Sequence, residues 1–172
     1  MIHPDPHPIT AFISRWGPSG GAERSNYQLF LAELCDVLGV ERPQPASEIE
    51  TDNAYVFEKS VPSPHGTTNA IDLYKRGCFV LEAKQGSDRP GSADPAFSAK
   101  EIYRRKSAKR GAAVRETGAW DTAMEKARQQ AQSYARNLPP EEIRDGRPPF
   151  VITVDVGNTI SFYSEFSRTG GN

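Results

Sequence analysis

Apolar residues recur along the chain with two spacings, one typical of helices and the other typical of strands. Spacings of three and four residues predict two long helices, at 22–38 and 120–137, and a short helix is expected at 10–16. Runs of β-branched, aromatic and aliphatic residues predict five strands, at 55–61, 71–74, 78–83, 150–156 and 159–163. Counting the long helices, the order is helix, three strands, helix, two strands. This order predicts a single fold that combines helices with a sheet.

Each long helix carries one apolar stripe, which is the face expected to pack against the sheet. The first helix ends at Gly39, and its stripe consists of Tyr27, Phe30, Leu31, Leu34 and Leu38. The second helix is stopped by two prolines, and its stripe consists of Trp120, Met124, Ala127, Ala131, Tyr134 and Leu138.

The most informative stretch of the chain is 69–86, which predicts a β-hairpin of two short strands joined by a tight turn. The second strand begins as a continuous apolar run, typical of a central strand, and ends in Glu82 and Lys84. Because side chains alternate along a strand, Glu82 and Lys84 point to the same side, and Asp72 on the neighbouring strand reaches the same place. Two carboxylates and an ammonium therefore converge at one rim of the predicted sheet.

Such a group of charges suits the hydrolysis of a phosphodiester. Mg²⁺, or Mn²⁺ as its substitute, is commonly held by one or two carboxylates together with waters and substrate oxygens, so Asp72 and Glu82 are the expected ligands. Lys84 beside them is expected to orient the attacking water and to stabilise the charge that grows on the phosphate oxygens. Glu23, in the first turn of the first long helix, either interacts with the helix dipole or points into this charged rim.

A Glu-x-Lys tripeptide alone is weak evidence, because it often arises by chance. The alternative is a surface hairpin whose charges are simply solvated. Such a hairpin would carry polar residues along its whole second strand, whereas an apolar run at 78–81 precedes Glu82. The context therefore favours the catalytic interpretation.

Composition restricts the remaining possibilities. At 172 residues, one domain is expected at 10–168, after a disordered lead at 1–9 and before a tail or linker at 169–172. Because the net charge is −1, affinity for a polyanion must come from local clusters of basic residues. Two cysteines in apolar runs and three scattered histidines offer no disulfide or zinc pattern. No apolar run approaches the ~18 residues of a membrane span, so a soluble, cytoplasmic protein is expected.

The segment 86–118 shows no clear periodicity and predicts a long loop, which at this length is often functional. Between positions 100 and 115 it has one acid and seven basic residues, namely Lys100, Arg104, Arg105, Lys106, Lys109, Arg110 and Arg115. This cluster is either a solvated flexible segment or a contact for DNA phosphates. Its position after the predicted catalytic strand favours contact with double-stranded DNA.

The spacing of the three charged residues of the hairpin resembles a known motif. Asp72, nine intervening residues, and then Glu82, one residue and Lys84 resemble the PD-(D/E)xK nuclease superfamily. Ile71 stands where the proline of the motif commonly lies, a position that carries no chemistry. The predicted element order is also the one expected of the restriction-endonuclease-like core of this superfamily. The resemblance therefore implies an α/β fold with a mixed central sheet of about five strands flanked by helices.

Two further features extend the resemblance. Gln130 and Tyr134 on the second long helix resemble the QxxxY motif of the RecB-like branch, and Glu23 lies where some members place an additional acid. Longer segments, including NAIDLYKRGCFVLEAKQG and ARQQAQSYARNLP, are more specific. They resemble the N-terminal nuclease domain of MmeI-type (type IIL) restriction-modification enzymes and of related large DNA methyltransferases in phage defence. The resemblance covers 10–168.

This resemblance implies a Mg²⁺-dependent endonuclease domain that hydrolyses phosphodiester bonds in duplex DNA. It assigns roles to six residues, with Asp72, Glu82 and the further candidate Glu23 as metal ligands, Lys84 as the catalytic lysine, and Gln130 and Tyr134 as supporting residues.

The resemblance also implies a larger parent enzyme. In that family a helical connector, an adenine-specific methyltransferase that uses S-adenosylmethionine, and a target recognition domain follow in the same chain, and dimerisation on DNA is a further expectation. The present chain is then an excised N-terminal domain or a truncated relative. The alternative function is a cleavage-inactive DNA-binding or docking domain of a DNA adenine methyltransferase.

Overall fold

The computed structural model describes residues 7–19, 23–63, 66–87 and 113–164 of the chain. Among them are three helices, α1 (Pro8–Trp16), α2 (Glu23–Leu38) and α4 (Gly118–Asn137), and five strands, β1 (Tyr55–Pro62), β2 (Thr68–Lys75), β3 (Phe79–Lys84), β4 (Phe150–Asp155) and β5 (Thr159–Ser164). Two 3₁₀ turns, η1 (Glu50–Asp52) and η2 (Pro140–Glu142), lie before β1 and after α4. The predicted α/β class and element order are confirmed.

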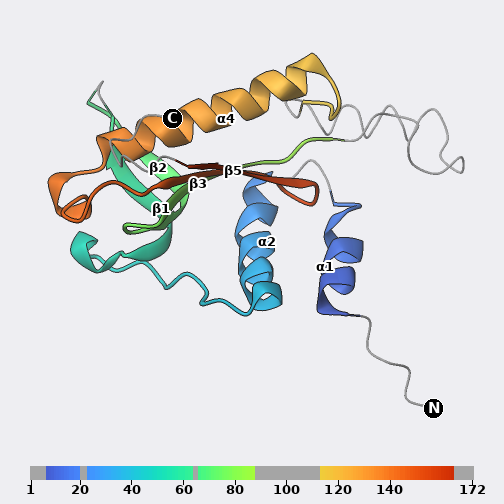
Figure 1. Ribbon diagram of the computed structural model, residues 1–172, viewed down its shortest axis with the longest axis horizontal. Helices are drawn as coiled ribbons and strands as arrows, with labels where there is room; N and C mark the ends of the chain where they lie inside the picture. Colours follow the sequence, from blue (N-terminus) through green and yellow to red (C-terminus); the bar gives the residue numbers. More distant parts are fainter. Residues whose placement is uncertain (1–6, 20–22, 64–65, 88–112, 165–172) are drawn as a thin grey trace, which may run out of the picture.

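The five strands form one mixed sheet in the order β1-β2-β3-β4-β5 (Figure 1). Sequential strands pair as antiparallel neighbours, except that β3 and β4 are parallel. Gly77 and Gly157 adopt positive φ angles of 64° and 81° in the β2–β3 and β4–β5 turns, where a side chain would be strained. The parallel pair requires a longer crossover, and α4 provides it.

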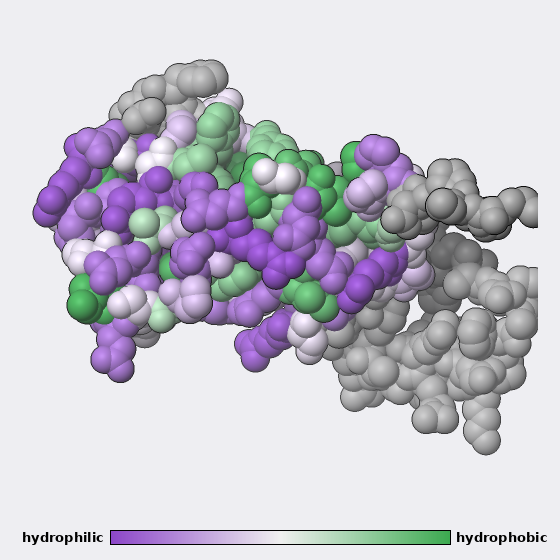
Figure 2. Space-filling view, turned by 90° about the horizontal axis from the view of Figure 1, so that it is seen from below, coloured by the Kyte–Doolittle hydropathy of each residue, from purple (hydrophilic) through white to green (hydrophobic). Residues whose placement is uncertain are grey.

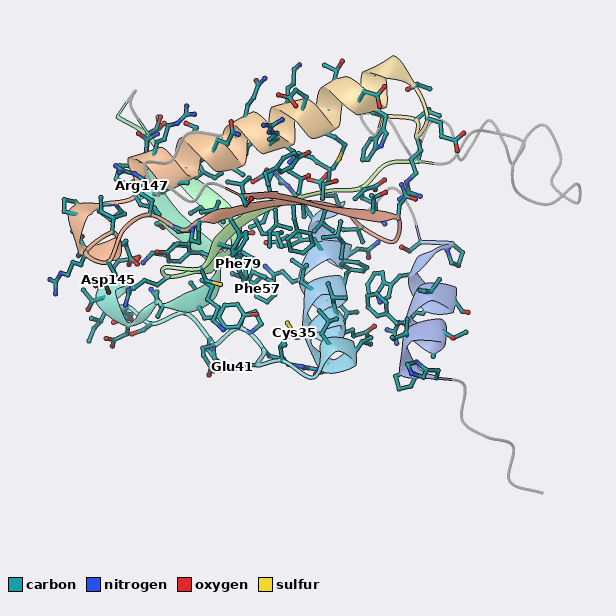
Figure 3. All side chains as sticks on the ribbon, in the orientation of Figure 1. Cys35, Glu41, Phe57, Phe79, Asp145 and Arg147 are labelled. Carbon is teal, nitrogen blue, oxygen red and sulfur yellow. The ribbon has the colours of Figure 1, made fainter. Side chains whose placement is uncertain are left out.

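Helices cover both faces of the sheet, with α4 on one face and α2, flanked by α1, on the other (Figure 1). The buried apolar residues accordingly form two clusters, one under α2 and one under α4. Alternate residues of β3 serve the two clusters, because Leu81 and Ala83 pack on the α2 side and Val80 on the α4 side. Figure 3 shows Phe57 and Phe79 between the sheet and α2.

The two long helices, α2 and α4, pack on the sheet through their predicted apolar stripes, and each differs from the prediction in one respect. Leu38, the last residue of α2, is 63% exposed, because it lies on the rim of an open pocket and not under the sheet. In α4 the tightest contacts come from small residues, since Ala127, Ala131 and Ala135 are almost completely buried. Their size lets α4 lie close to the strands. Among the described helices, none is long and apolar enough to cross a bilayer.

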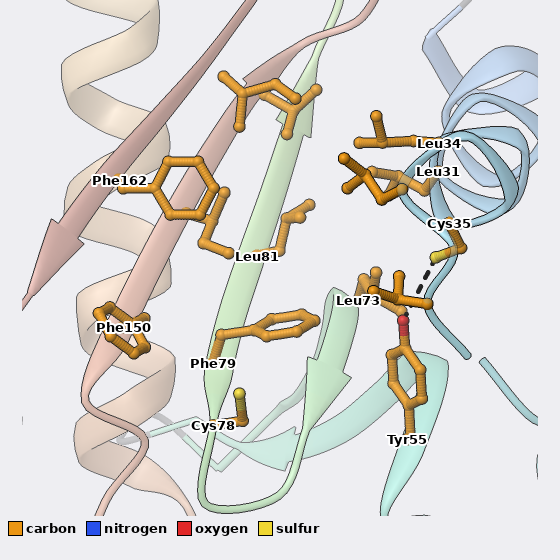
Figure 4. Close-up of a pocket in the computed structure, with 15 residues that line it drawn as sticks. Leu31, Leu34, Cys35, Tyr55, Leu73, Cys78, Phe79, Leu81, Phe150 and Phe162 are labelled. Carbon is orange, nitrogen blue, oxygen red and sulfur yellow. Dashed lines mark hydrogen bonds between the residues drawn. The ribbon is translucent and has the colours of Figure 1, made fainter. Parts of the chain in front are cut away.

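An apolar pocket of about 310 Å³ lies between α2 and the sheet (Figure 4). The free thiols of Cys35 and Cys78 both line it, and Cys35 Sγ lies 3.5 Å from the hydroxyl oxygen of Tyr55. Phe150 and Phe162 form part of its wall and remain 37% and 68% exposed. In the view from below, hydrophobic side chains are gathered in patches within a largely hydrophilic surface (Figure 2).

A buried ionic cluster ties the segment after α4 to β1 and β2. Its centre is Glu142, which contacts Lys59 Nζ at 2.9 Å and Arg76 Nε at 2.6 Å and accepts a hydrogen bond from the Tyr74 hydroxyl at 2.9 Å. Burial alone would raise the pKa of Glu142, but the hydrogen bonds from Arg76, Lys59 and Tyr74 outweigh it and lower the pKa to about 2. Glu142 is therefore a fully compensated buried carboxylate.

Replacing Glu142 by Gln should destabilise the fold, because Lys59 would stay buried with only the more exposed Glu50 to balance its charge. We expect a loss of about 3 kcal/mol in the free energy of unfolding near pH 7, measured by urea denaturation. Glu141→Gln is the matched control, since Glu141 is the exposed neighbour. Equal losses of unfolding free energy in the two variants would contradict the role of Glu142 as the centre of the buried ionic cluster.

The Glu142→Gln variant also tests how the contribution of Glu142 to the unfolding free energy depends on pH. The folded-state pKa of Glu142 lies below its ordinary value of 4.5, so its contribution is fully present above that pH and is lost as the pH falls toward 2. The difference in unfolding free energy between wild type and Glu142→Gln should therefore narrow over this range.

Candidate active site

The candidate site lies where β2 and β3 separate. In the described strands their backbone pairing extends to Leu73 and Leu81 and no further. At the next position the Asp72 carboxylate intervenes, because the backbone N–H of Ala83 donates to Asp72 Oδ2 at 2.7 Å. A side chain thus serves as the acceptor for a strand N–H, and charged groups can be accommodated between the two strands.

Glu82 and Lys84 follow on β3, on the face that α4 covers. Val80 packs in the α4 cluster, so the alternation of side chains places Glu82 and Lys84 on that side too. Lys84 Nζ donates to Glu82 Oε1 at 2.7 Å. Glu82 is 3% exposed, and its other oxygen, Oε2, has no hydrogen-bond partner among the described residues. The structure therefore brings Asp72, Glu82 and Lys84 to one place.

Burial and mutual repulsion raise the pKa of both carboxyl groups. Burial is the larger cause for Glu82 and the charge of Asp72 is the next, and its pKa rises to about 7 despite the opposing effect of Lys84. Burial also raises the pKa of Asp72, against the effects of the Ala83 N–H and of Lys84. For Lys84 itself, burial lowers the pKa, but the charge and hydrogen bond of Glu82 outweigh burial and the net pKa is raised. Lys84 is therefore an ammonium at neutral pH.

Glu23 reaches the same rim from the first turn of α2. Its Oε2 accepts a hydrogen bond from the backbone N–H of Gln85 at 3.1 Å, and its Oε1 lies 3.9 Å from Lys84 Nζ. The Gln85 side chain links two more residues to the site, because it accepts from Asn26 Nδ2 at 3.1 Å and donates to Ser19 Oγ at 3.2 Å. The start of α2 is thus fixed against the end of β3.

Gln130 and Tyr134 form a pair on α4. Gln130 Nε2 donates to the Tyr134 hydroxyl oxygen at 2.6 Å, and Tyr134 is 6% exposed. Burial raises the pKa of Tyr134, and the negative charges of Glu82 and Asp72 add to the rise. The hydroxyl therefore lies within the electrostatic reach of the two carboxylates and keeps its proton.

The sequence does not predict the role of Glu58 on β1. Glu58 has a positive φ of 53°, and it interrupts the alternation of side chains, because Phe57 packs on the α2 side and Lys59 reaches the cluster on the other face. The Tyr27 hydroxyl donates to Glu58 Oε1, and the charge of Glu58 contributes to the raised pKa of Asp72. No local pattern marks this position, since the run 55–61 is typical of a regular strand.

Arg115 does not belong to the predicted cluster of DNA-contacting residues. It is 8% exposed, and its guanidinium binds the fully buried Asp155 through two contacts, Nε to Oδ2 at 2.8 Å and Nη2 to Oδ1 at 2.9 Å. Gly86 adds its backbone N–H to Asp155 Oδ1 at 3.0 Å and leaves room for Arg115, because a Cβ at Gly86 would lie 2.8 Å from the arginine side chain. A buried carboxylate requires a counter-charge, so Arg115 serves Asp155 and not a phosphate.

The other basic residues of the predicted cluster lie outside the described residues: Lys100, Arg104, Arg105, Lys106, Lys109 and Arg110. Their contact with DNA stays a prediction.

Within the described part of the chain, no group of three or more His, Cys, Asp or Glu side chains is arranged to hold a metal ion. A cation at this rim would therefore depend on the two carboxylates of Asp72 and Glu82 together with water or substrate oxygens. This is a common mode of Mg²⁺ binding.

Fold and site together define an α/β domain with a mixed sheet and a charged site at the rim where two of its strands part. The family model described as MmeI, N-terminal domain, matches residues 5–169, and the chain belongs to this family. The predicted resemblance is thereby confirmed, and the domain belongs with restriction-modification enzymes. Neither a curated protein nor a solved structure matches the chain.

The backbone at Glu58 predicts an unusual order of stability between two variants. Glu58→Gly and Glu58→Ala both remove the acceptor for Tyr27, but only alanine keeps a Cβ in the left-handed region, at a cost of about 1 kcal/mol. Glu58→Gly should therefore be the more stable of the two in urea denaturation. At the exposed position Ser60 of the same strand, the alanine variant should be the more stable. If alanine were the more stable variant at both positions, Glu58 would not need a positive φ.

Proposed function

We propose that this domain is a Mg²⁺-dependent endonuclease that hydrolyses phosphodiester bonds in duplex DNA, as part of a restriction-modification enzyme. The observation that supports it is the Glu82 carboxylate, which is buried with one oxygen on Lys84 and the other without a partner among the described residues. Leaving a buried carboxylate half satisfied costs free energy. Positive charge brought to Glu82 and Asp72 removes that cost, so the arrangement favours a cation.

The donor set fits Mg²⁺. Asp72 and Glu82 provide two hard carboxylate ligands, Glu23 is a further candidate, and waters and phosphate oxygens would complete the coordination. When bound, the ion supplies neutralisation of the phosphate and a more acidic water for attack. Mn²⁺ would substitute for it, because the ligands are all oxygens.

The side chains around the carboxylates would complete the chemistry. Lys84 is held as an ammonium by Glu82, so it suits the stabilisation of negative charge on the phosphate oxygens and not the removal of a proton. Tyr134 keeps its proton and has Gln130 as its partner, so the pair offers hydrogen-bond donors and acceptors to water or phosphate at this rim.

Affinity for DNA would come mainly from outside the carboxylate cluster. The basic residues between 100 and 110 are the proposed phosphate contacts, and both ends of their segment are fixed near the site by the pairing of Ser87 with Val114. In the parent enzyme, methylation of adenine with S-adenosylmethionine and recognition of the target sequence would belong to other domains.

A second candidate function is a docking domain of a DNA adenine methyltransferase that does not cut DNA. The apolar pocket beside α2 favours it, because exposed apolar side chains such as Phe162 commonly mark protein contacts. This pocket and the carboxylates lie on opposite faces of the sheet. Cleavage that depends on Asp72 and Lys84 distinguishes the two functions.

Asp72→Ala or Lys84→Ala should abolish cleavage by the parent enzyme and leave methylation intact. Loss of Asp72 removes a cation ligand, and loss of the Lys84 ammonium should lower the rate at least ~10²- to 10³-fold, as for one electrostatic stabiliser. Nicking of supercoiled plasmid with Mg²⁺ is measured against methylation of the same substrate. Lys126→Ala, at an exposed position of α4, is the control for loss of a positive charge. Unchanged cleavage in either site variant contradicts the proposal.

Neutralising Arg104, Arg105 and Lys106 together should weaken DNA binding and lower its salt dependence. Each lost phosphate contact reduces the slope of log K against log salt by about one, so the slope should fall by up to about three. Fluorescence anisotropy with a DNA duplex at several salt concentrations measures it. An unchanged slope would mean that another surface holds the DNA.

A further inference from the structure

Thr153 places a hydroxyl in the most buried part of the sheet. It lies in the middle of β4, its relative exposure is 0%, and the adjacent Ile152 and Val154 are apolar. Among the described residues, Thr153 Oγ1 has no hydrogen-bond partner. Burying an unpaired hydroxyl costs about 1 to 3 kcal/mol, and valine would have the same shape without that cost. The hydroxyl therefore requires an explanation that packing does not provide.

The position of Thr153 in the sheet supplies one. In the parallel pairing of β3 and β4, Thr153 is the partner of Glu82. Partner residues on neighbouring strands place their side chains on the same face, and here that face is the one covered by α4, because Val80 and Val151 flank the pair and pack in the α4 cluster. Glu82 Oε2 and Thr153 Oγ1 are thus a buried acceptor and a buried donor on adjacent strands, and each is without a hydrogen-bond partner among the described residues.

We propose that Thr153 is a positioning residue for Glu82, and that its hydroxyl donates to Glu82 Oε2 when a divalent cation is bound at the site. The inference rests on the proposed function. Lys84 already holds Oε1, so a second hydrogen bond on Oε2 would fix the plane of the carboxylate. Each carboxylate oxygen has two lone pairs, so Oε2 can accept from Thr153 and still face the cation. Residues that orient a metal ligand in this way typically contribute 10- to 100-fold to metal affinity.

A packing role and a positioning role make different demands on the side chain. Packing needs the two methyl-sized branches, which valine retains. Positioning needs the hydroxyl, which serine retains. Ser161, the partner of Thr153 on β5, offers a matched control, because Ser161→Ala removes a hydroxyl from the same row of the sheet one strand further from Glu82.

The test is a titration of the 172-residue chain with Mn²⁺ in the absence of DNA, measured by isothermal calorimetry. Thr153→Val should weaken Mn²⁺ binding by about 10- to 100-fold. Thr153→Ser and Ser161→Ala should bind close to wild type. In the absence of metal, the thermal midpoint of Thr153→Val should be no lower than that of wild type, because an unpaired buried hydroxyl is removed.

Three results would overturn the inference, and they are distinguishable. If wild type binds Mn²⁺ and Thr153→Val binds it equally well, Thr153 has no positioning role and the proposed function stands. If wild type does not bind Mn²⁺, the proposed cation site fails and this inference fails with it. If Thr153→Ser and Thr153→Val both bind Mn²⁺ more weakly than wild type and to the same extent, the inference is also overturned. The shape of the side chain and not its hydroxyl would then matter.

Discussion

The separation of β2 from β3 at Asp72 is the constraint on which the rest of the site depends. A continuous antiparallel ladder would use the Ala83 N–H for a backbone carbonyl, and instead the Asp72 carboxylate accepts it. Because a side chain replaces the backbone acceptor, the sheet keeps its hydrogen bonding while the strands part. Glu82, one residue before Ala83, is then buried beside another carboxylate without a full set of partners. This hydrogen bond therefore holds Asp72 near Glu82, where the charge of Asp72 adds to the effect of burial on the pKa of Glu82.

Three buried carboxylates among the described residues show how differently one fold treats the same group. Glu142 has Lys59, Arg76 and Tyr74 around it, and its pKa falls to about 2. Asp155 accepts hydrogen bonds from Nε and Nη2 of the Arg115 guanidinium. Glu82 has a single ammonium and a neighbouring negative charge, and its pKa rises to about 7. The first two are compensated and tie distant segments together. At the third, the single ammonium does not offset burial and the neighbouring negative charge, which is the condition that favours a functional site over a structural ion pair.

The parts that local pattern determines were predictable from the sequence, and the parts that depend on contacts between distant segments were not. Periodicity predicts both long helices and the hairpin, and alternation along β3 places Glu82 and Lys84 together. The pairing of Arg115 with Asp155, 40 positions away, depends on how β4 ends beside β3 and has no local signal. The same holds for Thr153, which reads as an ordinary β-branched strand residue until the parallel register places it beside Glu82. Glu58 escapes prediction because a left-handed residue inside a strand contradicts local propensity.

The Arg115–Asp155 pair lies where the chain between β3 and α4 returns to the sheet. Asp155 is the register partner of Lys84, so the carboxylate that binds Arg115 lies directly across from the candidate catalytic lysine. Ser87 on the entering side and Val114 on the leaving side are bridged next to it. Both ends of the segment are therefore anchored within a few residues of Lys84. The position of both ends near Lys84 is thus supported by a buried ion pair.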